Sequence, residues 1–276
     1  LTQFHWPEHP LGRPVSGDLD SVSRLHLDDV RNFYKTWYTP ENMFFSIAGN
    51  FDPDEVFPLI RKAFEKLPQN SKSEARRDAP AFNGGVNQGN RDISQTHLGI
   101  AFPGPMLGMQ ERYYCDFAGS VLGGSSTSRL FERIREDEGL AYAIYTFQAF
   151  HLAAGMMGIY AAVAPGNYQR TIELIFQELQ RLRDETVPAE ELEMNREQIK
   201  GNLLMAMEST FTRVAHMAKS MMYYGRIVPV EEIIDNIDRV SAGDVQGFAQ
   251  RAFQAGRCAL VTLGPYGDFH LKRIPL

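Results

Sequence analysis

The sequence has little cysteine, no long apolar run and no excess of basic residues, and each lack excludes a class of protein. Cys115 and Cys258 are the two cysteines among 276 residues, too few for a disulfide framework. No apolar stretch reaches the length of a membrane-spanning helix, and the N-terminus carries no signal peptide. A net charge of −6 argues against nucleic-acid binding, which favours a basic surface. The 43% hydrophobic and 22% charged residues are typical of an ordinary soluble globular protein of about two domains.

Several catalytic signatures are missing too. The sequence has no Gly-x-Ser-x-Gly turn, no P-loop and no dinucleotide-binding glycine pattern. Five histidines stand alone, without a His, Cys or carboxylate partner at a metal-ligand spacing that makes structural sense, so we expect surface or locally bonded side chains. They are His26, His97, His151, His216 and His270.

The first fifty residues echo the last forty. The pattern Asp-Val-x-x-Phe at residues 29–33 is followed by an apolar run that ends at Gly49, and the same pattern at residues 244–248 by one that ends at Gly264. In both copies the glycine follows the aspartate by twenty residues. This self-match indicates duplication of a supersecondary unit.

The duplication predicts the domain organisation. We expect residues 1–70 to be the C-terminal part of a first repeat, residues 71–93 a polar, glycine-containing linker, residues 94–265 a complete second repeat and residues 266–276 a tail. About 120 residues of the first repeat would then precede Leu1 or lie on another chain, and the missing initiator Met agrees with a cut chain. Any targeting segment at the start of the protein would be missing with them.

Apolar periodicity predicts strands first, then a block of helices, then a closing strand. This order predicts an α+β fold, a tandem of α/β sandwich repeats whose first member is truncated. Six methionines in the helical block are expected to fill the core rather than line a binding groove. Helices are expected at 27–37, 52–67, 110–122, 129–138 and over most of 167–253, and strands at 43–48, 96–102, 140–150, 156–164 and 257–263.

The segment His5-Trp6-Pro7-Glu8-His9 matches H-x-x-E-H, the inverted zinc-peptidase motif. Its chemistry requires both imidazoles on one helical turn, with the glutamate poised as a base on zinc-bound water. Pro7, Pro10 and Gly12 oppose such a helix, and no third ligand follows at a suitable place. We therefore expect that His5, Glu8 and His9 match by chance and that this chain holds no metal.

Arg135 and Tyr142 offer more chemistry. Arg135 is expected in the last turn of a helix and Tyr142 at the start of the next strand, while Gly139 folds the chain between them. A guanidinium and a phenol together can donate to a peptide carbonyl and to the oxyanion that develops on it. Gly123 and Gly124 form a turn that supports this site. From the residues alone, the favoured alternative is that Arg135 simply pairs with Glu132 or Glu138.

Motifs along nearly the whole chain resemble the pitrilysin and mitochondrial-processing-peptidase family of zinc peptidases (M16), specifically its bacterial two-repeat branch. The segment His9-Pro-Leu-Gly-Arg-Pro14 and the pattern Trp37-Tyr-x-Pro-x-Asn42 resemble late parts of the family's first repeat. Leu122-Gly-Gly, Ser128-Arg-Leu-Phe and the stretch from Ile134-Arg135 to Tyr142 resemble the signature of the second.

The resemblance implies a tandem of homologous α+β domains and zinc-dependent cleavage of peptides or unfolded segments. It carries the substrate-binding Arg/Tyr pair onto Arg135 and Tyr142, with the expected separation of seven residues, and carries the zinc motif onto no residue of this chain. Zinc and the catalytic glutamate are therefore expected upstream or on a partner subunit, this chain alone is expected to be inactive, and a homo- or heterodimer is conceivable. The compartment stays open between bacterial periplasm and cytoplasm.

Two alternatives remain. In one, the protein is a non-catalytic partner that lends Arg135 and Tyr142 to a zinc-bearing chain. In the other, it is a structural subunit without a proteolytic role; retention of the Arg/Tyr pair argues mildly against that. The long glycine-rich loop of the non-catalytic processing-peptidase subunit is absent, because Gly124 is followed by only four residues before Arg129.

Overall fold

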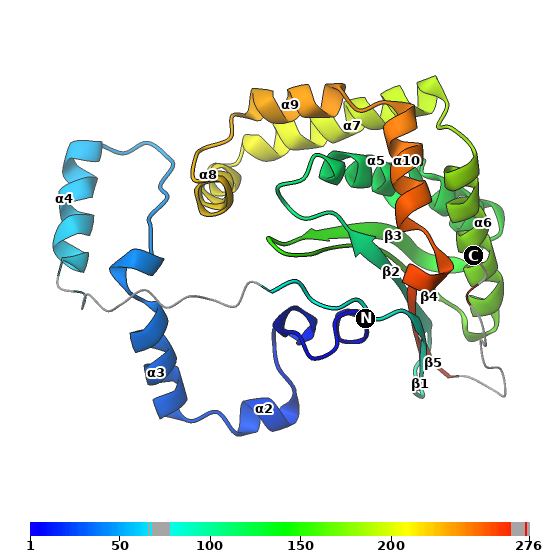
Figure 1. Ribbon diagram of the computed structural model, residues 1–276, viewed down its shortest axis with the longest axis horizontal. Coiled ribbons are helices and arrows are strands. Elements are labelled where there is room, and N and C mark those ends of the chain that lie inside the picture. Colours follow the sequence, from blue (N-terminus) through cyan, green and yellow to red (C-terminus); the bar gives the residue numbers. More distant parts are fainter. Residues whose placement is uncertain (66, 68–77, 266–273, 275–276) are drawn as a thin grey trace. The chain divides into compact units, whose positions relative to one another are not determined.

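The computed structural model describes residues 1–65, 67, 78–265 and 274, and it divides the chain into two compact units (Figure 1). Unit 1 comprises Leu1–Arg13, Asp78–Gly201 and Val230–Leu276; unit 2 comprises Pro14–Arg77 and Asn202–Pro229. Each unit therefore gathers segments that are far apart in the sequence.

Unit 1 is built on a five-stranded sheet. Its order is β1-β5-β2-β4-β3, with β1 and β5 parallel and the other neighbours antiparallel. On the central strand β2, Ile100 lies opposite Ile159 of β4 and Leu260 of β5, and all three side chains are buried. The strands are β1 (Gly85–Asn90), β2 (Thr96–Gly104), β3 (Ala141–Phe150), β4 (Gly155–Val163) and β5 (Ala259–Gly264).

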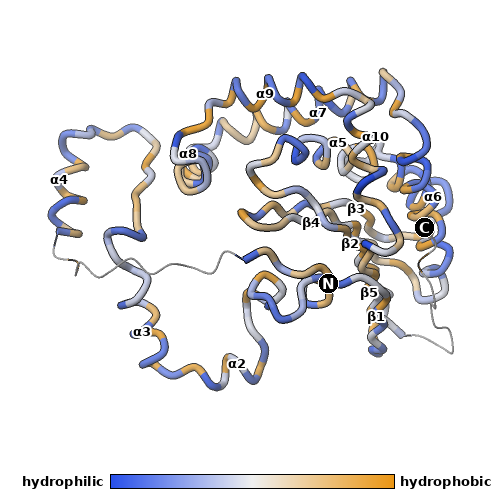
Figure 2. Tube along the Cα trace, viewed as in Figure 1, coloured by the Kyte–Doolittle hydropathy of each residue, from blue (hydrophilic) through white to orange (hydrophobic). Residues whose placement is uncertain are grey.

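Helices cover one face of this sheet. Figure 1 shows α5 and α10 above the strands and α6 at the right beside them. Figure 2 shows apolar residues concentrated in the strands, while these helices alternate between apolar and polar. Helix α6 has Ile172, Ile175, Leu179 and Leu182 on its buried side at helical spacing. The helices of unit 1 include α5 (Glu111–Gly123), α6 (Tyr168–Asp184), the first part of α7 (Ala189–Met207), α9 (Val230–Asp238) and α10 (Ala242–Ala252), with short turns η4 (Pro165–Asn167) and η5 (Ala255–Arg257).

The N-terminal segment packs against the other face. Helix α1 (Thr2–His5) leads into Trp6, which forms an apolar cluster with Ala101, Met156 and Ala259, and the turn η1 (Pro10–Gly12) follows. His5 is completely buried, and its ring lies edge-on between Trp6 and Phe82. Neither of its ring nitrogens has a hydrogen-bond partner within the described part of the chain. Burial lowers the pKa of His5 to about 4.

His5 therefore makes stability depend on pH. Below about pH 6.5 the unfolded chain binds a proton at this residue, whereas the folded chain does so only near pH 4, so stability falls as the pH drops through this window. We expect a loss of about 2 kcal/mol from this residue. In urea titrations between pH 7 and 4, His5→Phe should flatten the pH profile and the exposed-site control His26→Gln should not. Parallel profiles for wild type and His5→Phe would contradict the assignment.

Unit 2 contains helices but no strand among its described residues. It comprises α2 (Leu19–Ser23), α3 (Leu27–Trp37), η2 (Pro40–Asn42), α4 (Pro53–Phe64), the end of α7 and α8 (Thr210–Tyr224). The Ser46 hydroxyl donates to the Val214 carbonyl and ties the segment after η2 to α8. Gly225 ends α8 in the left-handed conformation typical of a helix terminus.

The structure differs from three sequence-based expectations. Residues 43–48 form no strand, because no described segment pairs with them. The expected linker contains β1, an edge strand of the sheet; its residues 71–77 lie outside the described part of the chain. The methionines of α7 and α8 are largely exposed rather than core residues: Met194, Met205, Met221 and Met222.

The predicted α+β fold is confirmed, and helices at 27–37 and 110–122 and strands near 96–102, 140–150 and 156–164 form close to their expected places. Cys258 is fully buried, as expected of a small core residue. The boundaries of the two repeats stay a prediction, and nearly all of the expected tail (266–276) lies outside the described residues.

Candidate functional site

Arg135 lies in a π-helix. A short helical start at residues 129–130 leads into η3 (Phe131–Asp137), a π-helix in which the wider turn places an extra residue. Leu130 and Ile134 are fully buried and fix this segment to the core, while Arg135 is exposed. π-Helical turns are rare and occur frequently at functional sites.

The Arg135 guanidinium has no carboxylate partner among the described residues. Glu138 instead accepts from Arg170 at 2.8 Å and lies 3.8 Å from Arg133, and the hydrogen bond from Arg170 lowers the pKa of Glu138. The guanidinium carbon of Arg135 lies 4.7 Å from the centroid of the Phe131 ring. The alternative expectation, that Arg135 is neutralised by Glu132 or Glu138, is therefore wrong.

Tyr142 lies on a β-bulge at the start of β3. Ala141 is opposite Val163 and Ala143 is opposite Ala162, so Tyr142 is the extra residue where the register shifts. Its side chain is 60% exposed. Bulges re-aim side chains and are common beside active sites. Two irregularities of the backbone thus flank the same turn, one at each residue of the predicted pair.

Glycines shape this turn and its support. Gly139 has a φ of 60°, a left-handed conformation that favours glycine, and it reverses the chain between η3 and β3. A side chain at Gly123 would come within 2.9 Å of the Thr146 backbone nitrogen, and one at Gly124 within 2.7 Å of the Ser120 Cα atom. The small size of Gly123 therefore lets the end of α5 pack closely on β3, and that of Gly124 lets the chain leave α5 close to the helix's own last turn.

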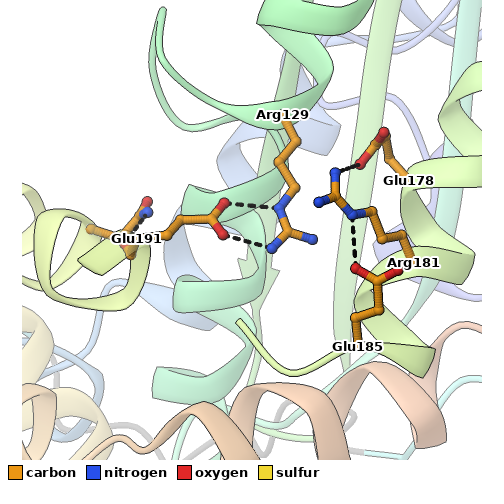
Figure 3. Close-up of polar contacts among 6 residues, drawn as sticks. Arg129, Glu178, Arg181, Glu185 and Glu191 are labelled. Carbon is orange, nitrogen blue, oxygen red and sulfur yellow. Dashed lines mark hydrogen bonds and ion pairs between the residues drawn. The ribbon is translucent and has the colours of Figure 1, made fainter. Parts of the chain in front are cut away.

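A charged contact that the sequence analysis missed anchors the start of the helical segment. Arg129 donates to both carboxylate oxygens of Glu191, at 2.8 and 2.6 Å (Figure 3). The two side chains are 10% and 23% exposed, and Glu191 lies in the first turn of α7. Nothing in the spacing of residues 62 apart signals this pair, which only the fold brings together.

The H-x-x-E-H segment does not form the helix that its chemistry requires. Helix α1 ends at His5, Glu8 has a left-handed φ of 61°, and the His9 ring accepts from the Leu11 amide to cap η1. Over the described residues, no three His, Cys, Asp or Glu side chains lie together as a metal site. The sequence resemblance implies a zinc ion, but the described residues provide no site that fits it.

Three of the five isolated histidines have local partners instead, and His26 is exposed at the start of α3. His97 shares a hydrogen bond of 2.7 Å with the Tyr160 hydroxyl, and His216 one of 2.7 Å with the Val228 carbonyl. The His151 ring packs edge-on against Trp6. His270 lies outside the described residues. In the same described part of the chain, no helix has both the length and the hydrophobicity to span a membrane.

Unit 2 contains an apolar groove of about 510 Å³. Phe44, Phe45 and Ile47 line it from the segment that was expected to be a strand, and Met217 and Met221 line it from α8. Part of the methionine-containing block thus lines a groove, the alternative that the sequence analysis disfavoured.

Comparisons with known proteins agree with the fold. A family model described as the peptidase M16 inactive domain matches residues 24–199. An uncharacterized zinc protease of Mycobacterium leprae is 30% identical over 265 residues, covering 95% of this chain and 59% of the relative. The uncharacterized zinc protease YmxG of Bacillus subtilis is 30% identical over 268 residues, covering 97% and 65%. The chain thus spans about three fifths of the length of these curated relatives.

A solved structure shows the same fold. The crystal structure of a protease from Helicobacter pylori superimposes with a TM-score of 0.83 at 17% identity, over 96% of this chain and 65% of that one.

Proposed function

Because this chain belongs to the M16 peptidase family, we propose that it is the C-terminal portion of a zinc-dependent metalloendopeptidase that cleaves peptides or unfolded segments. Its part in the reaction is to bind the substrate backbone and stabilise the transition state. The remainder, which holds the zinc, lies upstream on the same polypeptide or on a partner subunit of the pitrilysin or processing-peptidase type. We call the combination of both parts the assembled peptidase.

One observation carries this proposal: Arg135 and Tyr142 are both exposed, flank the Gly139 turn and have no polar partner among the described residues. Burying a guanidinium or a hydroxyl without a hydrogen-bond partner is destabilising. At the surface, the same groups stay hydrated and can donate to a ligand when it binds. The π-helix and the β-bulge that present them support the same reading.

The chemistry of this pair follows from its donors. Arg135 would donate N–H groups to a carbonyl oxygen of the peptide and place a positive charge beside it. Tyr142 would donate its O–H group to the oxygen on which negative charge develops as the carbonyl carbon becomes tetrahedral. Both interactions strengthen as that charge grows, so they favour the transition state over the bound substrate.

The exposed apolar surface of unit 2 supports the proposal that the rest of the first repeat packs against it. Phe33 of α3 is 59% exposed, whereas Phe248, its counterpart in the duplicated segment of α10, is 5% exposed. Residues 43–48, which line the groove, are the counterpart of β5 in the duplicated segment. β5 has a neighbouring strand on each side, whereas the described residues provide none beside 43–48. We propose that the rest of the first repeat covers α3 and pairs with residues 43–48.

The zinc content and the activity of purified proteins test the proposal. The 276-residue chain alone should bind substoichiometric zinc and cleave no fluorogenic peptide, whereas the assembled peptidase should bind zinc and lose its activity to a chelator. Activity that appears only after mixing with a zinc-bearing partner would favour the partner-subunit alternative. Chelator-sensitive cleavage by the chain alone would contradict the proposal.

A further inference from the structure

We propose that Phe131 is the positioning residue for Arg135, and that an aromatic face rather than a carboxylate holds this guanidinium. The inference deepens the proposed function, on which it rests. Its starting point is the 4.7 Å distance between the guanidinium carbon of Arg135 and the Phe131 ring centroid, well within the range of a cation–π contact.

The helical backbone and its buried neighbours hold the Phe131 ring in place. Phe131 opens the π-helix and is half-buried, with the fully buried Leu130 before it and Ile134 one turn later. The amide of Leu140 donates to the Ile134 carbonyl at 2.9 Å and closes the segment. Phe131 and Arg135, four residues apart, lie on one face of the helix, so the long arginine side chain extends over an already ordered ring.

The nearby acidic side chains do not pair with Arg135, so its guanidinium contacts the Phe131 ring instead. Two acidic side chains lie three residues from Arg135. Glu138 is engaged by Arg170 and Arg133, and Glu132 forms no ion pair with Arg135 among the described residues. A carboxylate would neutralise the guanidinium and occupy its N–H groups in a bidentate contact. An aromatic ring contacts the flat face of the guanidinium instead, so the charge and the N–H donors along its edge remain available to a ligand.

This arrangement suits the carbonyl oxygens of a peptide backbone, the ligand that the proposed function requires. Such an oxygen would lie in the plane of the N–H donors, where no acceptor from the described residues already binds Arg135. Ordering the side chain before the ligand binds also removes part of the entropy that a free arginine would lose. Phe131 therefore acts through Arg135 and raises the affinity of its N–H groups for the substrate.

Two variants of Phe131 in the assembled peptidase test the inference. Phe131→Leu keeps an apolar side chain of similar size but removes the ring face, and we expect kcat/KM to fall about two- to fivefold, the effect of one exposed cation–π contact. Phe131→Tyr keeps the ring and should retain wild-type kcat/KM. Equal rates for wild type and Phe131→Leu, or equal losses in both variants, would overturn the inference.

A second measurement needs no activity. In proton NMR spectra of the 276-residue chain, the Arg135 Hδ protons should be shifted upfield by the Phe131 ring current, and Phe131→Leu should move them to ordinary arginine values. Unchanged shifts would overturn the inference. Full activity of Arg135→Ala would instead refute the proposed function itself, whereas a large loss in Arg135→Ala beside wild-type behaviour of Phe131→Leu would refute only the role of Phe131.

Discussion

Arg135→Ala should lower kcat of the assembled peptidase by about 10²–10³-fold, the loss observed when one donor to a developing oxyanion is removed. Tyr142→Phe, which removes a hydroxyl and keeps the ring, should cause a loss of similar order. KM should change much less than kcat, because these donors strengthen their contacts in the transition state. Steady-state cleavage of a fluorogenic peptide measures both constants.

The chain offers matched controls for both changes. Arg133 lies on the same helical segment, and its guanidinium is already close to Glu138, so Arg133→Ala should leave kcat nearly unchanged. Tyr145 is also partly exposed on β3, three residues after Tyr142, and Tyr145→Phe should behave likewise. If Arg135→Ala and Tyr142→Phe retain wild-type kcat, the assigned role is wrong and a structural subunit becomes the better reading.

Glu191→Ala should destabilise the chain by about 3 kcal/mol, because it leaves the largely buried Arg129 charge without its partner. The value is at the low end for buried ion pairs, since 23% of the Glu191 side chain remains exposed. The double change Arg129→Met with Glu191→Leu removes both charges and should recover most of the loss. Urea unfolding of the 276-residue chain provides the free energies.

An exposed ion pair in the same region serves as the control (Figure 3). Arg181 contacts Glu185 at 3.0 Å on the surface of α6, with both side chains more than half exposed. Glu185→Ala should therefore change the free energy of unfolding by no more than about 0.5 kcal/mol. A similar cost for Glu185→Ala and Glu191→Ala would show that the Arg129 pair does not anchor the helical segment.

Much of unit 1 was predictable from its sequence, because its strands and helices carry complete patterns. The apolar run of β2 indicates a buried strand, and the helical spacing of apolar residues in α6 indicates which side of that helix is buried. The residue types and spacing of Arg135, Gly139 and Tyr142 also predicted a helix, a turn and a strand in that order. Local sequence and tertiary packing agree at these places.

The errors occurred where the outcome depends on partners distant in the sequence. An apolar run such as residues 43–48 becomes a strand only beside another strand, and β1 has glycine and asparagine in place of the usual strand residues. The pairing of Arg129 with Glu191 likewise requires the fold. The π-helix and the β-bulge are each a shift of one residue, too small for periodicity to reveal.

The place of β5 has a consequence for how the chain is made. β5 enters the sheet between β1 and β2, although about 170 residues separate it from the end of β1. At ordinary rates of translation, β1 leaves the ribosome about 10–30 s before its pairing strand exists. Until then the nascent chain exposes two incomplete sheet edges. A truncation that removes only the last strand would therefore release β1 as well, and the newly made protein is most vulnerable to proteases and to aggregation in this interval.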